Sequence, residues 1–545
     1  MANPSLQIGN SNWAIKKDNL LGYSTAGTRF LPIPITMTRA SAGTRVNPQG
    51  LVETVELLGS ELVTNGNFEL NSDWNNFSTP TTSEQSTEQS HTGTYSWKVI
   101  ADATQEGIFS PNNFSITNGN SYSVSLWIYS VSGNSIKSGL NNTNVSVFTE
   151  RTVIAGQWTN ITYEATATST GASYISILSQ NSLNFYVDNV SVKESTKNDL
   201  ARVDYTGSTS SLLAEPQRTN LEADSSDFSQ WSKFNTLVVT DDVISLDGTQ
   251  NADFIKADAN NTAHTIFNNY TVSNATSYTF TVYVKKNNLS YFQITSGQGF
   301  GNYFSNFNLD NGTVEVSTHI RASIDLVSNG WYRCTVELLS STTTGQVYPS
   351  IIKNATDSRN ASNGDLLDKG YYVWGAQLEE GSYATSYIPT SGSTVTRVQD
   401  QYTKTGISDK INSTEGTLFV EMAALANDGT YRYVLLSDGA TANMIQIRYS
   451  DVSNNIQALV YSSSVLQAFT SYTPTDTTSF HKMAFKYKEN DFALWVDGTE
   501  VGTATSGIPP INLSSLDFQS YFGKVKQLQV FKTALTDSEL ATLTT

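Results

Sequence analysis

Hydrophobic and polar residues alternate along much of this chain, and the clearest alternation occurs twice. Residues 113–129 have the sequence NFSITNGNSYSVSLWIY, and residues 269–285 have the sequence NYTVSNATSYTFTVYVK. The two segments match at one constant offset, and each predicts a strand, a polar turn and a second strand. Alternation with a period of two over this length is typical of a β-strand with one buried face. Two diverged copies of one module indicate a chain built by duplication.

The second strand of each copy has one apolar face, formed by Tyr122, Val124, Leu126 and Ile128 in the first copy and by Tyr278, Phe280, Val282 and Val284 in the second. The opposite face carries Trp127 and Tyr129, and Tyr283 occupies the position of Trp127 in the second copy. In a sandwich of two sheets, a strand turns one face to the core and the other to solvent or to a cleft. We therefore expect these three aromatic rings to lie outside the core, with the alternative that loops fold over them.

The rest of the chain continues the pattern of short strands separated by turns. Dipeptides such as Asn65-Gly66 and Asp247-Gly248 predict tight turns, and no long stretch has helical periodicity. These features predict an all-β protein, an array of β-sandwich or jelly-roll domains. The predicted parts are an extended N-terminal arm at 1–60, module one at 61–195, a linker at 196–219, module two at 220–388, a second linker at 389–412 and a C-terminal domain at 413–545.

Proline decides the interpretation of the first sixty residues. Pro32, Pro34 and Pro48 fall among short apolar runs, and proline at this frequency excludes a helix or a central strand. We predict an extended arm that needs a partner surface to become ordered. A disordered terminus is the alternative.

Composition and charge exclude several classes of protein. The formal net charge is −17, which argues against nucleic acid as a partner and against adsorption on an anionic membrane. A hydrophobic content of 38% supports packed cores, and the single cysteine, Cys334, excludes internal disulfides. No stretch has the apolar length of a transmembrane helix, and the first thirty residues lack the apolar core of a signal peptide. We therefore expect that the protein does not insert into a membrane. We also expect it to be made in the cytoplasm and not exported.

Three parts of the chain resemble known carbohydrate-binding folds. Module one carries an NGNFE opening from Asn65, a GTYSWKV strand, the YSVSLWIY strand and a YVDNVSV ending. In this order it resembles a jelly-roll carbohydrate-binding module, and module two keeps the order with weaker similarity. The stretches FHKMAFKYKENDFALWVDG and FGKVKQLQVFKTALTDSELATL make the C-terminal domain similar to the laminin-G or concanavalin-like lectin fold. The resemblance implies glycan binding by β-sandwich domains.

The connecting segments carry a second resemblance. They are TRASAGTRVNPQGLVE near the N-terminus, ARVDYTGSTSSLLAEPQRTNL from Ala201 and YIPTSGSTVTRVQD from Tyr387. These segments resemble connectors in structural proteins of tailed bacteriophages. The resemblance implies a virion surface protein, made in the host cytoplasm and located on the virion.

The aromatic positions fit the chemistry that the first resemblance implies. A flat aromatic ring offers apolar area to the C–H face of a pyranose, and neighbouring amide and hydroxyl groups orient the sugar. Trp127, Tyr129 and Tyr283 are therefore the candidate glycan-binding residues. Four other tryptophans lie at strand starts and are expected in the core: Trp74, Trp158, Trp231 and Trp331.

Jelly-roll modules of this kind imply a structural calcium ion near the two ends of the module. The matching oxygen donors in module one are Glu69 in NGNFE and Asp188 in YVDNVSV, because calcium takes hard oxygen ligands. The alternative is that both are surface carboxylates. Module two has Trp374 at the position of Asp188, so no metal is expected there.

The sequence shows no recognisable catalytic constellation. It contains no G-x-S-x-G, H-E-x-x-H or Walker motif. The C-terminal domain lacks the E-x-D-x-x-E carboxylates of concanavalin-like glucanases. We therefore predict a protein that is not an enzyme, with a catalytic site built from distant carboxylates as the alternative.

These observations together favour a phage virion surface protein, such as a fibre, an appendage or a decoration protein. Its N-terminal arm would attach to other virion proteins, and its β-domains would bind cell-surface or environmental polysaccharide weakly and multivalently. Self-association is expected, with a trimer favoured, because symmetric particles present symmetric sockets. The alternatives are a bacterial surface adhesin that binds polysaccharide and a glycan depolymerase.

Overall fold

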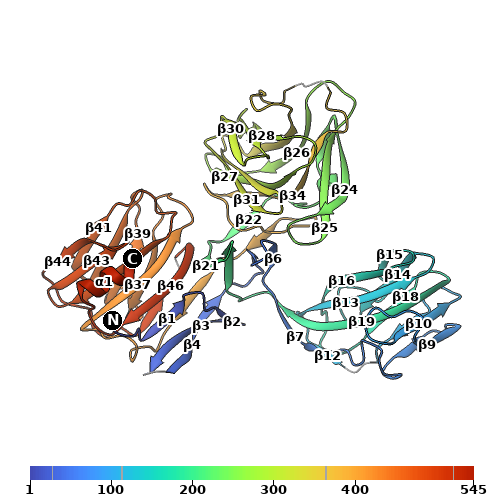
Figure 1. Ribbon diagram of the computed structural model, residues 1–545, viewed down its shortest axis with the longest axis horizontal. Coiled ribbons are helices and arrows are strands. Elements are labelled where there is room, and N and C mark those ends of the chain that lie inside the picture. Colours follow the sequence, from blue (N-terminus) through green and yellow to red (C-terminus); the bar gives the residue numbers. More distant parts are fainter. Residues whose placement is uncertain (27–28, 112–113, 362–364, 519–520) are drawn as a thin grey trace. The chain divides into compact units, whose positions relative to one another are not determined.

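The computed structural model describes the chain except for residues 27–28, 112–113, 362–364 and 519–520, and it confirms an all-β array (Figure 1). Its helical elements within that described part are α1 (Asp537–Thr544) and the short 3-10 turn η1 (Phe228–Gln230). No helix of the described residues is long and apolar enough to cross a membrane. The chain divides into two compact units, residues 56–197 and the combined segments 1–55 and 198–545.

The unit of residues 56–197, called module one from here on, is a sandwich of two sheets. The first sheet has the order β16 (Trp158–Thr166), β13 (Ser121–Ser130), β19 (Leu183–Thr196), β10 (Ser96–Ala101) and β9 (Thr82–Ser86), with β7 (Leu57–Glu61) paired to β19. The second has the order β15 (Glu150–Val153), β14 (Asn134–Leu140), β18 (Ile175–Ser179), β11 (Gly107–Phe109) and β8 (Asn75–Phe77), and β12 (Phe114–Ile116) pairs with β17 (Gly171–Ser173).

Strand β13 shows why this sequence makes a sandwich. Its even-numbered side chains, from Tyr122 to Ile128, are buried in the core between the sheets, and its odd-numbered side chains are half-buried on the other face. This is the alternation that the sequence predicts. Asn113, the first residue of the repeat, lies outside the described residues.

Module two, in the second unit, has the same architecture. One sheet has the order β24 (Thr236–Ile244), β25 (Gln250–Ala257), β34 (Gly370–Glu380), β27 (Ser277–Lys286), β32 (Trp331–Leu339) and β31 (Arg321–Ser328). The other has the order β23 (Ser232–Phe234), β26 (His264–Thr271), β33 (Thr344–Ile351), β28 (Tyr291–Gln298), β29 (Phe304–Asn308) and β30 (Thr313–Ser317).

The two repeat strands, β13 and β27, have equivalent neighbours. In the pairing of β13 with β19, the register shifts between Ser125 and Trp127, and in the pairing of β27 with β34 it shifts between Thr281 and Tyr283. The irregularity therefore falls at the same position of both copies. Positions can be compared one by one between the modules on this basis.

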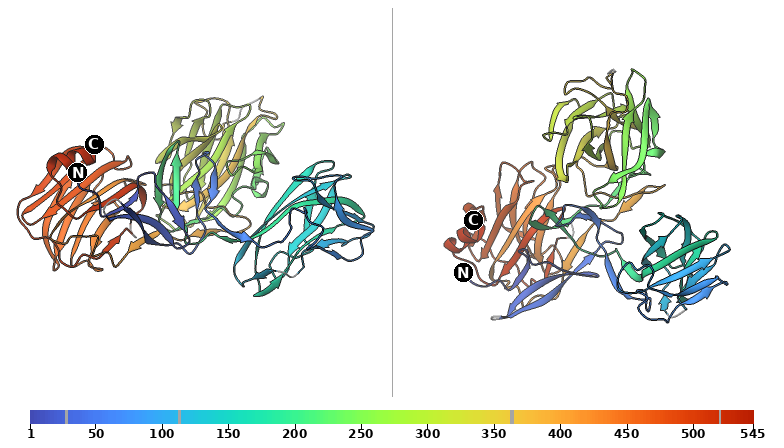
Figure 2. Two further views of the ribbon diagram at one scale, coloured as in Figure 1. Left: turned by 60° about the horizontal axis from the view of Figure 1, so that its bottom comes forward. Right: turned by 45° about the vertical axis from the view of Figure 1, so that its right-hand side comes forward.

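The C-terminal domain is built from β37 (Glu415–Ala424), β38 (Arg432–Ser437), β39 (Met444–Tyr449), β40 (Ile456–Ser462), β41 (Val465–Tyr472), β42 (His481–Lys488), β43 (Asp491–Val496), β44 (Thr499–Ala504), β45 (Ser515–Asp517), β46 (Gly523–Phe531) and α1. Strands from earlier in the chain join it: β1 (Leu6–Gly9), β2 (Ala14–Lys16), β3 (Asn19–Ala26), β4 (Arg29–Thr38), β20 (Arg202–Thr206), β21 (Thr209–Ala214) and β36 (Gln401–Lys404). Strand β1 pairs with β46, and both views of Figure 2 place the blue N-terminal strands beside this domain.

The N-terminal segment therefore differs from the predicted arm, because it is folded into the second unit. Pro32 and Pro34 lie in β4, which pairs along its length with β3 on one side. On its other side, β4 pairs with β36 only at Thr36, Met37 and Thr38. The prolines thus occupy a stretch with a single neighbouring strand, where a missing N–H is tolerated. Both prolines are exposed, while the alternate residues of β4 contribute to the core.

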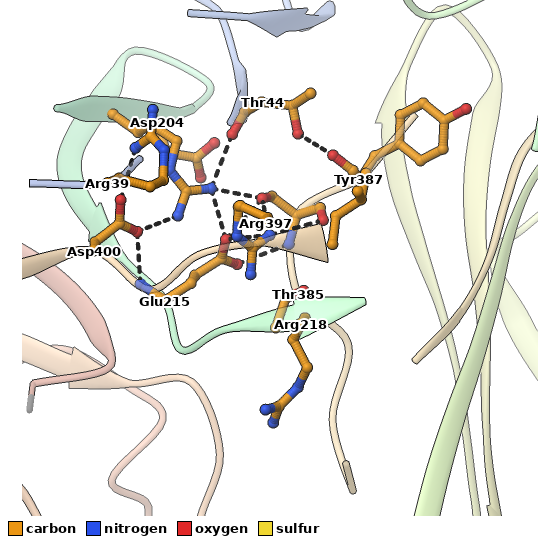
Figure 3. Close-up of polar contacts among 12 residues, drawn as sticks. Arg39, Thr44, Asp204, Glu215, Arg218, Thr385, Tyr387, Arg397 and Asp400 are labelled. Atoms are coloured by element: carbon orange, nitrogen blue, oxygen red, sulfur yellow. Dashed lines mark hydrogen bonds and ion pairs between the residues drawn. The ribbon is translucent and has the colours of Figure 1, made fainter. Parts of the chain in front are cut away.

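The two predicted linkers are ordered as well. They contain β20, β21, β22 (Arg218–Asn220), β35 (Val395–Arg397) and β36, and near them lies the hairpin β5 (Thr44–Val46) and β6 (Val52–Thr54). Their arginines and carboxylates explain this order. The side chains of Arg39, Arg202, Glu215, Arg397 and Asp400 are all buried and form one charged network (Figure 3).

Each carboxylate of this network faces two guanidinium groups. Asp400 pairs with Arg39 at 2.7 Å and also with Arg202, and Glu215 pairs with Arg202 at 2.6 Å and with Arg397 at 3.0 Å. Burial alone would raise the pKa of the Glu215 carboxyl, but the Arg397 and Arg202 guanidinium groups hold that pKa well below its ordinary value. The segments that resemble phage connectors thus meet at one buried network, which we call the arginine hub.

Candidate functional site

The outward face of the first sheet of module one gathers aromatic side chains. Tyr129 of β13 pairs with Trp158 of β16 on one side and with Tyr186 of β19 on the other. Trp127 is two residues away on the same face and pairs with Asp188 of β19. The register of three strands therefore brings four aromatic and acidic side chains next to Trp127, opposite the core.

These rings are in contact with one another and with His91 of the loop before β10. His91 stacks on Trp127 with ring centroids 3.8 Å apart and an interplanar angle of 17°, and it meets Trp158 edge-on at 5.6 Å. Tyr129 lies 5.8 Å from Trp158 and 6.0 Å from Tyr186. Tyr186 is buried, while the other four rings are half-buried. We call these five residues the aromatic platform.

Asp188 positions the loop that carries His91. Its carboxylate accepts backbone N–H groups from His91 at 2.8 Å and Thr92 at 3.1 Å, and from Asn189 at 2.7 Å. The Asn189 side chain also lies 3.1 Å from Nδ1 of His91. Burial raises the pKa of Asp188, and the N–H groups of Thr92 and His91 lower it only in part.

Glu69 holds the same loop from its other end. Its Oε1 accepts the backbone N–H groups of Thr94 at 2.8 Å and of Tyr95 at 3.0 Å. The oxygens of Glu69 and Asp188 that make these bonds face N–H groups, which would repel a cation. The described part of the chain holds no group of three or more His, Cys, Asp or Glu that could bind a metal ion. These contacts give the two carboxylates a role in holding the loop, and the calcium site that the resemblance implies stays a prediction.

Charged groups border the platform. Lys98 of β10 lies 2.6 Å from Glu88, and Tyr186 donates its hydroxyl hydrogen bond to Glu88 at 2.6 Å. The hydrogen bond from Lys98 lowers the pKa of the Glu88 carboxyl. Asn160, which pairs with Trp127 from β16, is exposed. Carboxylate, ammonium and amide groups therefore lie beside flat apolar rings, which is the combination that orients a polyhydroxyl ligand.

The equivalent face of module two is covered, so the expectation for Tyr283 is wrong. Tyr283 is only 4% exposed and packs against Trp374 at 5.4 Å and Tyr387 at 6.2 Å between ring centroids. Trp331, the counterpart of Trp158, belongs to the same buried cluster, and so does Val52 of the β5–β6 hairpin. Segments from outside the repeat fold over this face, which is the alternative that the sequence left open.

The tryptophans at strand starts do not all behave as expected. Trp74, Trp231 and Trp331 are buried, but Trp158 is half-buried in the platform. Sequence reasoning also missed His91 and Tyr186. The alternation of inward and outward side chains along their strands could have placed Trp158 and Tyr186 on the same face as Tyr129. Nothing in the local pattern places the His91 loop over Trp127.

Comparison with known proteins agrees with the location of the platform. Residues 60–181 match the family model described as a carbohydrate binding domain. This match includes His91, Trp127, Tyr129 and Trp158 and leaves out module two and the C-terminal domain. No curated protein sequence matches the chain.

Several solved structures show a distant likeness. The CBM40 of Ruminococcus gnavus IT-sialidase bound to α2,3-sialyllactose is 11% identical, covering 25% of this chain and 84% of that chain with a TM-score of 0.22. The CBM22-1–CBM22-2 tandem domain of Paenibacillus barcinonensis Xyn10C is 12% identical, covering 60% and 99% with a TM-score of 0.22. Trypanosoma rangeli sialidase in complex with the inhibitor DANA is 8% identical, covering 99% and 93% with a TM-score of 0.21. These TM-scores are too low to support a conclusion about function. The residues matched by the carbohydrate-binding family model thus include four of the five platform residues, and Tyr186 lies just beyond them.

Proposed function

We propose that the aromatic platform of module one binds carbohydrate, and that the protein is a carbohydrate-binding protein. The observation that carries the proposal is the half-buried group of His91, Trp127, Tyr129 and Trp158 on the outward face of one sheet. Rings of this kind take up the apolar face of a sugar, and the neighbouring Glu88–Lys98 pair can exchange hydrogen bonds with its hydroxyl groups. The family match over residues 60–181 supports the same function.

The proposed setting is the surface of a tailed-phage virion, as the connecting segments suggest. The attachment surface has to be revised, because the N-terminal segment is folded against the C-terminal domain through the pairing of β1 with β46. The virion contact would then be made by the folded second unit, and weak platforms on several copies of the chain would act together. Attachment of purified protein to virions that lack it would test this setting.

The test of the function is binding of the full-length chain to a panel of immobilised polysaccharides, followed by calorimetry on those it retains. Trp158→Ala should weaken binding by about tenfold or more, because truncating a tryptophan that anchors a ligand costs roughly 2 kcal/mol or more. Phe148→Ala is the matched control, since Phe148 is an exposed ring that contacts Phe77 of the opposite sheet. Equal binding by Trp158→Ala and the unmodified chain would contradict the proposal, and product release from the panel would indicate a depolymerase.

A further inference from the structure

A cleft of about 720 Å³, lined mostly by residues with polar side chains, lies within the second unit, between module two and the C-terminal domain. Its floor is the outward face of β31 and β32, with Arg321 and Ser323 on the first strand and Arg333, Thr335 and Glu337 on the second. Residues 425–427, which follow β37, line its other side. Asn427 is held there by hydrogen bonds with Ser453 at 2.7 Å and with the backbone of Asn454 at 2.8 Å, so this wall is already formed.

The cleft lies on the same sheet face as the covered aromatic cluster of module two. Arg333 pairs with Tyr283, and Glu337 lies four residues further along β32, beside Thr279. The corresponding residues of module one are Asn160 and Glu164, which continue the face of the platform. In module two, the aromatic part of this face, around Tyr283, is thus covered by other segments. The polar part, with Arg333 and Glu337, borders the cleft.

Two buried polar atoms of residues that line the cleft make no hydrogen bond within the protein. Glu337 is only 8% exposed, and its Oε2 is unpaired except for Arg321 Nε at 3.5 Å. Nε of Arg333 is also unpaired, although the Nη2 atom of the same side chain donates to the carbonyl of Thr385 at 2.6 Å. A buried carboxylate oxygen and a buried N–H without partners are costly. A ligand hydroxyl group could satisfy either one, because it both donates and accepts.

The charges and dimensions of the cleft narrow the class of ligand. Arg321 and Arg333 are balanced by Asp325 and Glu337, so the lining favours a neutral ligand. Arg333 and Glu337 lie about 14 Å apart along β32, from the rise of about 3.4 Å per residue, and this distance is longer than one sugar ring. The ring of Tyr383 lies near the guanidinium groups of Arg218 and Arg432, so it is not free for stacking.

We propose that this cleft is a second carbohydrate site, which binds a neutral oligosaccharide of at least two sugars through hydrogen bonds instead of aromatic stacking. Its hydroxyl groups would donate to Glu337 and accept from Arg333. The choice of a sugar over other neutral polyols rests on the function proposed for module one. The site itself rests on the cleft and its unpaired atoms.

The experiment uses the full-length chain with Trp127→Ala and Trp158→Ala, so that the platform is removed. Binding is measured by calorimetry with neutral xylan, β-glucan, mannan and α-glucan oligosaccharides of one to six sugars. We expect the hexasaccharide of at least one series to bind and its monosaccharide not to bind. Adding Glu337→Gln should weaken this binding about tenfold, since it removes a hydrogen bond to a charged group.

Ser323 provides a second variant with a matched control. Ser323 is exposed at the cleft, so Ser323→Trp should fill the cleft and abolish binding, while Ser323→Ala should change it less than twofold. The inference is overturned if the chain without the platform binds none of these sugars, or if its binding ignores both Glu337→Gln and Ser323→Trp. Cleft-dependent binding without any effect of Trp158→Ala on the unmodified chain would support the cleft and contradict the platform, so the two proposals fail separately.

Discussion

The two repeated modules present the same sheet face in opposite states. In module one, every second residue of β13 is half-buried on the outward face, whereas in module two the residues of β27 are buried on both faces from Tyr278 to Val284. The rings at equivalent positions, Trp127 and Tyr283, are both large and aromatic. What differs is the cover, since Tyr387 packs on Tyr283 and Val52 of the β5–β6 hairpin belongs to the same buried cluster.

This difference shows that an aromatic residue on the outward face of a strand can have either of two roles, ligand contact or packing against connecting segments. Where the ring stays half-buried, as on the platform, part of its surface remains exposed to solvent. Covered, it contributes apolar burial that fastens connecting segments to the sheet, at about 25 cal/mol per Å² of apolar surface. A duplicated module can thus keep its fold while the face that could bind a ligand in one copy packs against connecting segments in the other.

The largest effect should come from breaking the hub that holds the cover. Arg202 pairs with Asp400 and Glu215 and also donates to the carbonyl of Thr44 at 3.1 Å, in the β5–β6 hairpin. Arg202→Ala leaves buried carboxylates without their partner and should destabilise the second unit by about 3–5 kcal/mol. Urea unfolding measures the loss, and hydrogen exchange at Val52 should quicken. Unchanged hydrogen exchange at Val52 would show that the arginine hub does not hold the β5–β6 hairpin in place.

Removing the covered ring should cost somewhat less and should leave the platform intact. Tyr283→Ala opens a cavity in a buried cluster and should destabilise the second unit by about 3 kcal/mol. The matched variant Trp127→Ala truncates a half-buried ring, so its effect on unfolding should be smaller and its effect on glycan binding larger. The contrast fails if Tyr283→Ala lowers glycan binding as much as Trp127→Ala does.

The strands could be predicted from local sequence patterns. The exposure of each strand face could not, because it depends on tertiary contacts. Alternation located β13 and β27 and separated Trp127 from the core side chains of its strand. The same alternation runs through β4, where Ile33, Ile35 and Met37 are buried, but the prolines between them concealed it. Whether a strand's outward face stays open depends on segments far away in sequence, such as Val52 over Tyr283.

The arginine hub illustrates the same limit. Arg39, Arg202 and Arg397 are single charged residues in polar segments, and nothing nearby in the sequence marks them as buried. Only their convergence on Asp400 and Glu215 removes them from solvent. The roles of Glu69 and Asp188 were likewise hidden, because their partners are backbone N–H groups of one loop.

A moderate effect is expected from loosening the loop that carries His91. Asp188→Asn replaces one carboxylate oxygen with an amide group that cannot accept the N–H groups of His91 and Thr92 in the same way. Glycan binding should weaken by about three- to tenfold, as expected for the loss of a hydrogen bond of about 1 kcal/mol. Combined with His91→Ala, the two changes should be less than additive. Full additivity in calorimetry would show that Asp188 acts by another route.

The smallest effect should be a difference in acid sensitivity between the two faces. Burial raises the pKa of Asp188, so the closed loop takes up a proton more readily than the opened loop, and acidification should favour the closed loop. Burial is outweighed at Asp400, where Arg202 and Arg39 hold the pKa low, so its stabilising charge is lost only below that ordinary value.

Hydrogen exchange followed from pH 6 to pH 4 measures this difference. The amides of His91 and Thr92 should gain protection, while that of the Glu215 amide, which donates to Asp400 at 2.9 Å, should stay unchanged. Equal loss at both places would contradict the assigned pKa directions.

The central claim is that the aromatic platform of module one binds carbohydrate and that the covered aromatic cluster of module two does not. The most direct measurement is a titration of the full-length chain with a retained glycan, followed through the NMR signals of the tryptophan indole N–H groups. The account predicts that the signals of Trp127 and Trp158 shift while those of Trp331 and Trp374 stay in place. Shifts at Trp331 and Trp374 without shifts at Trp127 and Trp158 would contradict it.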